Sequence, residues 1–260
     1  MTSHSRTFTT PDESTINFRI DGKGAPLLLL QGQGTSMSWW DRMVPILAAH
    51  FTTVRFDYLG TGKSAASPKA QFTTRRFATD ATQLLDELEI PSAHVFGTSM
   101  GGKVAQWLAL DHPLRVDRLV LGCTMAGGSS AVNMSPRTAM RFSLPGQAGI
   151  DARLRLMYTD SFLAANAPNP SLARGPANRQ GITGHWKAST GHDTSALSSA
   201  IQHQTLLLHG EDDEVVPPEN AQILERLIPN SHLRTFPKLR HGFFDEDAYG
   251  TAKHLLQFLV

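Results

Sequence analysis

The sequence predicts an α/β protein with a mostly parallel sheet of about eight strands, flanked by helices. Short apolar runs alternate with stretches of helical periodicity, which is typical of a parallel sheet covered by helices on both faces. The alternation stops at about Thr124 and resumes at about Thr205, which predicts an insertion after the sixth strand. With 260 residues, of which 40% are hydrophobic, the chain is long enough for one substantial core.

The first half of the sequence shows the alternation most clearly. Leu27 to Leu30 are four consecutive leucines, which predicts a strand that is buried on both faces. Helical spacing of apolar residues and breaks at prolines indicate the elements between the strands. The elements that follow are a strand at 53–56, a helix at 72–89, a strand at 93–96, a helix that buries Val104, Ala105, Leu108 and Ala109, and a strand at 118–123.

Residues 125–202 break the alternation. This segment is rich in Gly, Pro, Ser and Asn, with scattered helical stretches such as 151–162. A connection of this length is uncommon inside a compact domain, so we expect it to form a lid or cap on a core made of 1–124 and 203–260. The core resumes with a strand at 205–208, a helix at 221–228, a strand at 232–236 and a helix at 246–260.

A glycine-rich motif lies between a predicted strand and a predicted helix. Gly97-Thr98-Ser99-Met100-Gly101 matches the pattern Gly-x-Ser-x-Gly. A tight turn there would raise the serine hydroxyl above the sheet edge, with the helix N-terminus pointing at it. Larger side chains two positions away would collide with the bent backbone, which explains the glycines. Ser99 is therefore a candidate nucleophile, and the alternative is a turn that only allows close packing of helix and strand.

A serine hydroxyl is a weak nucleophile unless a base takes its proton. Among the 11 histidines, His241 is favoured because it follows the last predicted strand. It is therefore expected at the same carboxyl edge of the sheet as Ser99. The imidazole in turn needs a carboxylate that orients it. The segment 209–217 supplies four acidic residues directly after another predicted strand.

Together these motifs resemble the α/β-hydrolase family over about 15–124 and 203–260. In that family the catalytic aspartate follows a glycine by three residues. Counting from Gly210 gives Asp213, with Asp212 as the main alternative. The chain order Ser99, Asp213, His241 is the order of this family. Among its members, 3-oxoadipate enol-lactonases and bacterial carboxylesterases are the most similar.

The resemblance also implies an oxyanion hole made of the backbone N–H groups of Met100 and Gln33. Gln33 lies in Gln31-Gly32-Gln33-Gly34, which resembles the family's His-Gly-x-Gly loop with glutamine in place of the histidine. Apolar residues of the insertion are candidates for the substrate pocket, although such residues also serve simply to pack a lid. These candidates are Met140, Met157, Phe162 and Trp186.

Several other classes of site are not expected. The segment 60–64 ends like a phosphate-binding loop, but Asp57 stands where the full motif needs glycine, and the segment resembles a structural turn of the family. No cofactor or metal is expected, because there is no His-Glu-x-x-His motif and Cys123 is the only cysteine. A net charge of +1 gives no reason to expect nucleic acid as a partner. No apolar run approaches a membrane span, and no secretory signal stands out, so a cytoplasmic location is expected.

The function implied is that of a serine hydrolase, which cleaves a small carboxylic ester or lactone through an acyl-enzyme intermediate. Two alternatives use the same triad, namely a cofactor-free haloperoxidase or perhydrolase and a carbon–carbon bond hydrolase. A ligand-binding receptor on a hydrolase fold is the non-enzymatic alternative. The sequence leaves the natural substrate and the oligomeric state open, with a homodimer among the options.

Overall fold

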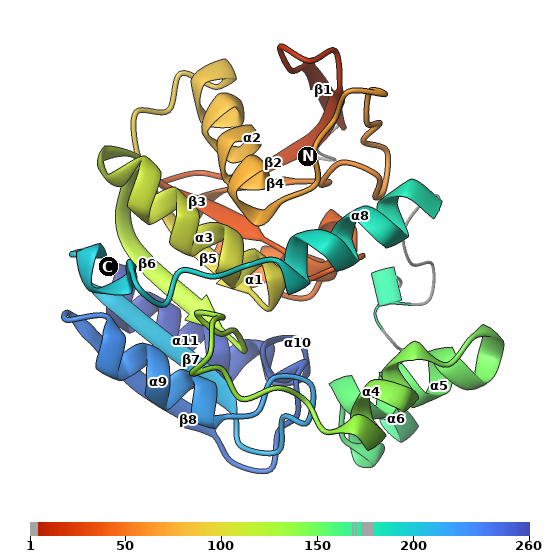
Figure 1. The fold of residues 1–260 in the computed structure, drawn as a ribbon. Coiled ribbons are helices and arrows are strands. Elements are labelled where there is room, and N and C mark those ends of the chain that lie inside the picture. Colours follow the sequence, from red (N-terminus) through yellow and green to blue (C-terminus); the bar gives the residue numbers. More distant parts are fainter. Residues whose placement is uncertain (1–4, 168, 170, 173–178) are drawn as a thin grey trace.

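The computed structural model describes residues 5–167, 169, 171–172 and 179–260. In this part of the chain, eight strands form one sheet in the order β1-β2-β4-β3-β5-β6-β7-β8 (Figure 1). The strands are β1 Arg6–Thr9, β2 Thr15–Gly22, β3 Ala25–Leu30, β4 Phe51–Phe56, β5 Ala93–Thr98, β6 Val116–Gly122, β7 Thr205–Gly210 and β8 Ser231–Phe236. The predicted fold class is confirmed.

The sheet is parallel from β4 through β3 to β8, and antiparallel at the edge formed by β1 and β2. These two edge strands were not among those predicted from the sequence. A signal was present, because Ile16, Phe18 and Ile20 alternate with polar residues, as expected for a strand with one covered face. The parallel part matters for the site, since its strands end at one common edge.

Helices cover both faces of the sheet. Their bounds are α1 Val44–Leu47, α2 Thr74–Glu87, α3 Met100–Asp111, α4 Pro136–Ser143, α5 Gly146–Met157, α6 Asp160–Ala165, α8 Arg179–Thr190, α9 Glu219–Leu227, α10 Phe243–Glu246 and α11 Ala248–Leu259. Short 3-10 helices lie at Met37–Trp40, Pro113–Arg115 and Ser198–Ala200. None of the helices in the described ranges is both long and apolar enough to cross a membrane.

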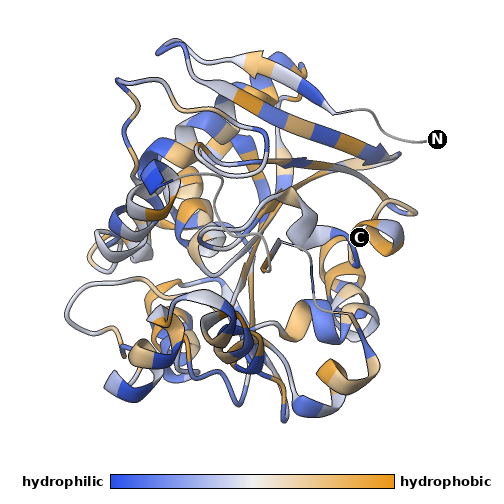
Figure 2. Ribbon diagram, turned by 90° about the vertical axis from the view of Figure 1, so that its right-hand side faces the viewer, coloured by the Kyte–Doolittle hydropathy of each residue, from blue (hydrophilic) through white to orange (hydrophobic). Residues whose placement is uncertain are grey.

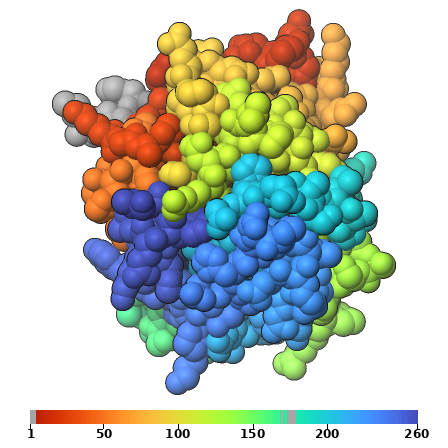
Figure 3. All heavy atoms as spheres, turned by 90° about the vertical axis from the view of Figure 1, so that its left-hand side faces the viewer, coloured from red at the N-terminus to blue at the C-terminus, as the bar shows by residue number. Residues whose placement is uncertain are grey.

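Two apolar cores lie on opposite faces of the sheet. One contains Leu28 and Leu30 with apolar residues of α2, α3 and α9, and the other contains Leu27 and Leu29 with residues of α1, α10 and α11. All four leucines are 0% exposed, which confirms the predicted burial on both faces. Figure 2 shows the apolar central strands between the helices. On the face shown in Figure 3, α11 lies against the segment that contains α1.

The long connection between β6 and β7 carries α4, α5, α6 and α8. Figure 1 shows α4 to α6 grouped together, while α8 lies apart from them and near α3. The helical stretch predicted at 151–162 corresponds to the second half of α5 and the start of α6. The role of this segment as a lid, with the division into core and insertion, stays a prediction.

Candidate active site

Ser99 occupies a strained turn between β5 and α3. Its backbone has φ 54° and ψ −120°, a conformation that costs a non-glycine residue on the order of 1–3 kcal/mol. A Cβ at Gly97 would lie 2.3 Å from Gly101 O, and a Cβ at Gly101 would lie 2.0 Å from Leu30 O. Gly97 is therefore required by the bent backbone of the turn, as expected from the sequence, whereas Gly101 is required by the close packing of α3 against β3.

Asp213 and His241 form a buried pair. His241 Nδ1 lies 2.7 Å from Asp213 Oδ2, and Asp213 is 3% exposed. The other carboxylate oxygen, Oδ1, accepts the backbone N–H groups of Val215 at 2.8 Å and Val216 at 2.9 Å. Asp212, the alternative considered from the sequence, is exposed to solvent. The loop after β7 therefore presents Asp213 to the histidine.

A second imidazole, which the sequence analysis missed, also contacts the carboxylate. His209 Nε2 lies 3.2 Å from Asp213 Oδ2 and 2.8 Å from the carbonyl oxygen of Val216. Since a carbonyl only accepts, His209 carries its proton on Nε2. Burial alone would raise the pKa of Asp213, but His241 and His209 outweigh it through charge and hydrogen bonds, so this pKa lies well below its usual range. The carboxylate therefore stays ionised.

Ser99 and His241 line one cavity of about 1320 Å³. Within the described ranges, the serine hydroxyl and the imidazole are not hydrogen-bonded to each other. Such catalytic hydrogen bonds often form only when substrate is bound. The apolar wall of the cavity includes Trp39, Met125, Met134, Phe142, Met157 and Val215. This volume exceeds the usual range for small-molecule sites and leaves room for a substrate beside the serine.

The two predicted oxyanion donors lie next to the nucleophile. Met100 is the first residue of α3, so its N–H has no acceptor within that helix. Gln33 lies at the cavity wall, and a Cβ on the preceding Gly32 would be 3.4 Å from Ser99 Cβ. Gln31 is fully buried, and its Nε2 donates to Phe56 O at 2.7 Å. The glutamine thus supports the loop at the position where the family more often has histidine.

His185 of α8 supports the same loop from the other side, and it too was missed from the sequence. Its Nδ1 accepts the N–H of Gly34 at 3.2 Å, while its Nε2 lies 2.8 Å from Leu59 O. The ring must therefore be neutral, with its proton on Nε2. Burial lowers the pKa of His185 to about 4, which favours this state at neutral pH.

Two of the four predicted pocket residues line the cavity. Met157 and Trp186 lie at its wall. Met140 and Phe162 do not, which corrects the expectation for these two. Met140 is 61% exposed, because α4 turns this side chain to solvent. Phe162 instead stacks on Tyr158, with ring centroids 4.9 Å apart.

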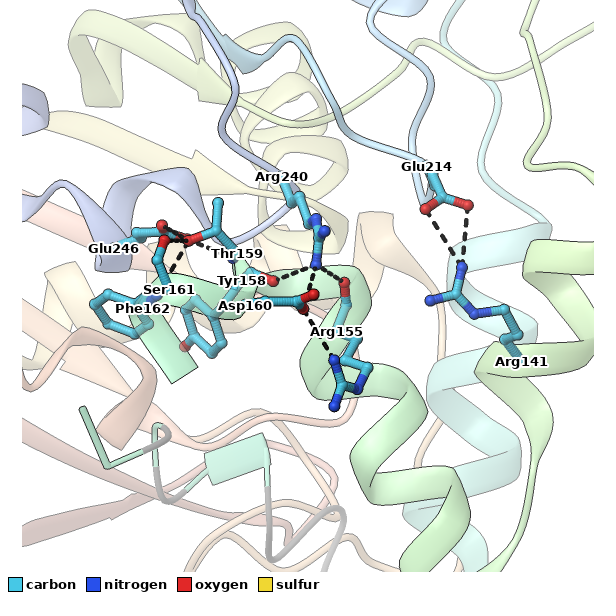
Figure 4. A network of polar contacts seen from close by, with 10 residues as sticks. All are labelled: Arg141, Arg155, Tyr158, Thr159, Asp160, Ser161, Phe162, Glu214, Arg240 and Glu246. Atoms are coloured by element: carbon cyan, nitrogen blue, oxygen red, sulfur yellow. Dashed lines mark hydrogen bonds and ion pairs between the residues drawn. The ribbon is translucent and has the colours of Figure 1, made fainter. Parts of the chain in front are cut away.

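Ion pairs and hydrogen bonds tie the loops of the buried pair to the insertion (Figure 4). Glu214, which follows Asp213, is exposed and pairs with Arg141 of α4 at 3.2 Å. Arg240, which precedes His241, donates to the carbonyl oxygens of residues 155 and 158 at 2.7 Å. The insertion therefore helps to hold both loops in place.

The segment that resembled a phosphate loop is a structural turn. The carboxylate of Asp57 accepts the backbone N–H groups of Met37 at 2.8 Å and Lys63 at 2.9 Å. A Cβ at Gly62 would lie 2.1 Å from Asp57 Oδ2, so the carboxylate fills the turn. Across the described residues, no group of three or more His, Cys, Asp or Glu is arranged to hold a metal ion.

Comparisons with known proteins agree with this architecture. Residues 25–157, just over half of the chain, match a family described as alpha/beta hydrolase fold. The 2-hydroxymuconate semialdehyde hydrolase of Pseudomonas sp. (strain CF600) is 29% identical over 260 residues, covering 94% of this chain and 90% of that protein. A hydrolase of Pseudomonas aeruginosa PA01 has a similar solved structure, with a TM-score of 0.85, 28% identity, and coverage of 100% of this chain and 99% of that one.

The fold also matches the enol-lactonase from Burkholderia xenovorans LB400, with a TM-score of 0.83, 24% identity, and coverage of 98% of this chain and 99% of that one. At this identity, the likeness supports the fold alone. The relatives that match over most of their length indicate a hydrolase. Because the family match spans more than half of its length, the chain belongs to the α/β-hydrolase family.

Proposed function

We propose that this protein is a serine hydrolase that cleaves a carboxylic ester or a lactone through an acyl-enzyme intermediate. One observation carries the proposal: Ser99, in a strained turn, shares a cavity with His241, whose Nδ1 is held by the buried Asp213. A base that faces the nucleophile and is oriented by a carboxylate is the arrangement that acyl transfer by serine requires.

The orientation of the histidine decides its role. Because Nδ1–H donates to Asp213, the lone pair of the neutral ring lies on Nε2 and is free to accept a proton. When Ser99 Oγ attacks the substrate carbonyl, its proton passes to Nε2. The ionised carboxylate of Asp213 stabilises the imidazolium that forms.

The remaining steps use the groups around the serine. The oxyanion of the tetrahedral intermediate accepts the N–H groups of Met100 and Gln33. Collapse of the tetrahedral intermediate breaks the bond between its central carbon and the oxygen of the leaving alcohol. The leaving alkoxide takes the proton from His241. In a lactone, this alcohol stays attached to the acyl group. Water then attacks the acyl-enzyme with His241 as base, which releases the acid and restores Ser99.

A second candidate is hydrolysis of a carbon–carbon bond next to a carbonyl. The similarity to a hydrolase of 2-hydroxymuconate semialdehyde favours it, because that substrate contains neither an ester nor a lactone. The same serine, base and oxyanion donors would serve this reaction. A haloperoxidase or perhydrolase activity on the same triad has no specific observation in its favour.

The test is hydrolysis of p-nitrophenyl esters from acetate to octanoate, with a γ-lactone and an enol-lactone alongside. Wild type is compared with Ser99→Ala and with Ser161→Ala, a control at an exposed serine. We expect turnover and fluorophosphonate labelling that both depend on Ser99 alone. Turnover retained by Ser99→Ala would refute the proposal. A wild type that is inert toward every ester but bleaches the chromophore of a dienone substrate would establish the second candidate instead.

A further inference from the structure

A lysine lines the cavity that also contains the nucleophile, and the mechanism above does not use it. Lys103 lies in the first turn of α3, and its backbone N–H donates to Ser99 O at 3.3 Å. The residue is only 8% exposed, yet it lines the same cavity as Ser99 and His241.

The ammonium group has unused hydrogen-bonding capacity. Lys103 Nζ donates to the carbonyl oxygen of Ser189 at 2.9 Å and to Ser189 Oγ at 3.1 Å. An ammonium carries three N–H bonds, so one remains. No carboxylate among the described residues forms an ion pair with Lys103. The charge is therefore buried beside neutral acceptors.

A buried ammonium without a counter-ion is costly. Burial lowers the pKa of Lys103 to about 8, so the group is still mainly protonated at pH 7. Ser189 lies in the last turn of α8, where the helix dipole favours a cation, so the fold accounts for part of this charge. The third N–H of the ammonium has no acceptor among the described residues.

The cavity wall carries more described cationic side chains than carboxylates. Among its described residues, three side chains are cationic, namely Lys103, Arg153 and Lys187, and one is a carboxylate, Asp193. Asp193 is exposed, and its Oδ1 accepts from the backbone N–H and the hydroxyl of Ser195. Lys187 is exposed as well, and Arg153 donates to the carbonyl oxygens of residues 142 and 144. Lys103 is therefore the buried charge on this wall that favours an anionic occupant.

We propose that Lys103 binds a carboxylate of the substrate, so that the preferred ester or lactone carries a free carboxylate in addition to the carbonyl that is attacked. This inference rests on the proposed function. The free N–H of Lys103 donates to the carboxylate, and charge-assisted bonds of this kind are strong in a site shielded from water. Because Lys103 and Ser99 line the same cavity, the bond would also orient the reacting carbonyl.

The test compares two matched substrate series, monomethyl glutarate and adipate against methyl pentanoate and hexanoate, with acid release followed by pH-stat. The variants are Lys103→Met, Lys103→Arg and Lys69→Met, a control at an exposed lysine outside the cavity. We expect Lys103→Met to lower kcat/KM roughly 10- to 100-fold for the carboxylate series, and less than about threefold for the neutral series. Lys103→Arg should retain part of the preference, and Lys69→Met all of it.

If Lys103→Met loses kcat/KM equally in both series and its melting temperature is unchanged, Lys103 only links two helices. This result would leave the proposed function intact. Failure of the wild type to hydrolyse either series would instead count against the proposed function. If Lys103→Met does not fold, inhibition of the wild type decides. Pentanoate should inhibit hydrolysis of methyl hexanoate more strongly than pentanamide does, and equal inhibition would overturn the inference.

Discussion

Acidification should destabilise this protein through His185, the histidine that joins α8 to the loop beside Ser99. Its ring is neutral in the fold, because Nδ1 accepts from Gly34 and Nε2 donates to Leu59. Protonation would place an N–H against the N–H of Gly34. The substitution His185→Gln removes this titration and supplies an amide that both donates and accepts.

The magnitude follows from the difference between two pKa values. The pKa of His185 is about 4 in the fold, against 6.5 for an ordinary histidine. Between these values the unfolded chain binds more protons than the folded chain, so stability falls as the pH falls. The stabilisation contributed by the neutral ring is complete above pH 6.5 and is lost toward pH 4. Between pH 7.5 and pH 5 the loss is about 2 kcal/mol.

Urea unfolding at pH 7.5 and pH 5 measures this loss. Other buried groups also titrate, so the informative quantity is the difference between wild type and His185→Gln. We expect the wild type to lose about 2 kcal/mol more than the variant over this interval. His50→Gln, at an exposed histidine, should behave like the wild type. If wild type and His185→Gln lose the same unfolding free energy over this interval, titration of His185 does not destabilise the fold.

Two further predictions concern the turn and the buried pair. Asp213→Asn should lower kcat for p-nitrophenyl acetate by roughly 10³- to 10⁴-fold, since an amide would favour the wrong tautomer of His241, whereas Asp212→Asn should change kcat less than about twofold. Gly101→Ala would place a Cβ 2.0 Å from a carbonyl of β3, so thermal unfolding should show a loss of at least about 3 kcal/mol. The matched Gly146→Ala, where no atom lies within 4 Å, should cost only about 1 kcal/mol.

The sequence predicted those features of the site that depend on local chain geometry. Gly97 is dictated by the turn of five residues around Ser99, and the strands that carry the site have apolar patterns of their own. Gly101 instead makes room for a carbonyl of β3. Asp213 was predicted because the acidic loop resembles that of the family, in which the aspartate follows a glycine by three residues. Contacts between remote segments left no such signal. His185 meets a loop that is 151 residues away, and Lys103 meets Ser189 across 86 residues.

The direction of a side chain within the insertion was equally hidden. Met140 and Met157 are both apolar residues on helices of the insertion, but the first faces solvent and the second lines the cavity. Composition alone cannot separate the two, because the direction depends on how each helix packs against the core.

The contacts of α5 constrain how the insertion could act as a lid. The backbone N–H of Gly242 donates to Met157 O at 2.8 Å, and Arg240 donates to Tyr158 O at 2.7 Å. These bonds attach the end of α5 to the loop that carries His241. A movement of this end would therefore displace the base together with the lid. If the insertion opens without displacing His241, the movement must therefore occur away from the end of α5.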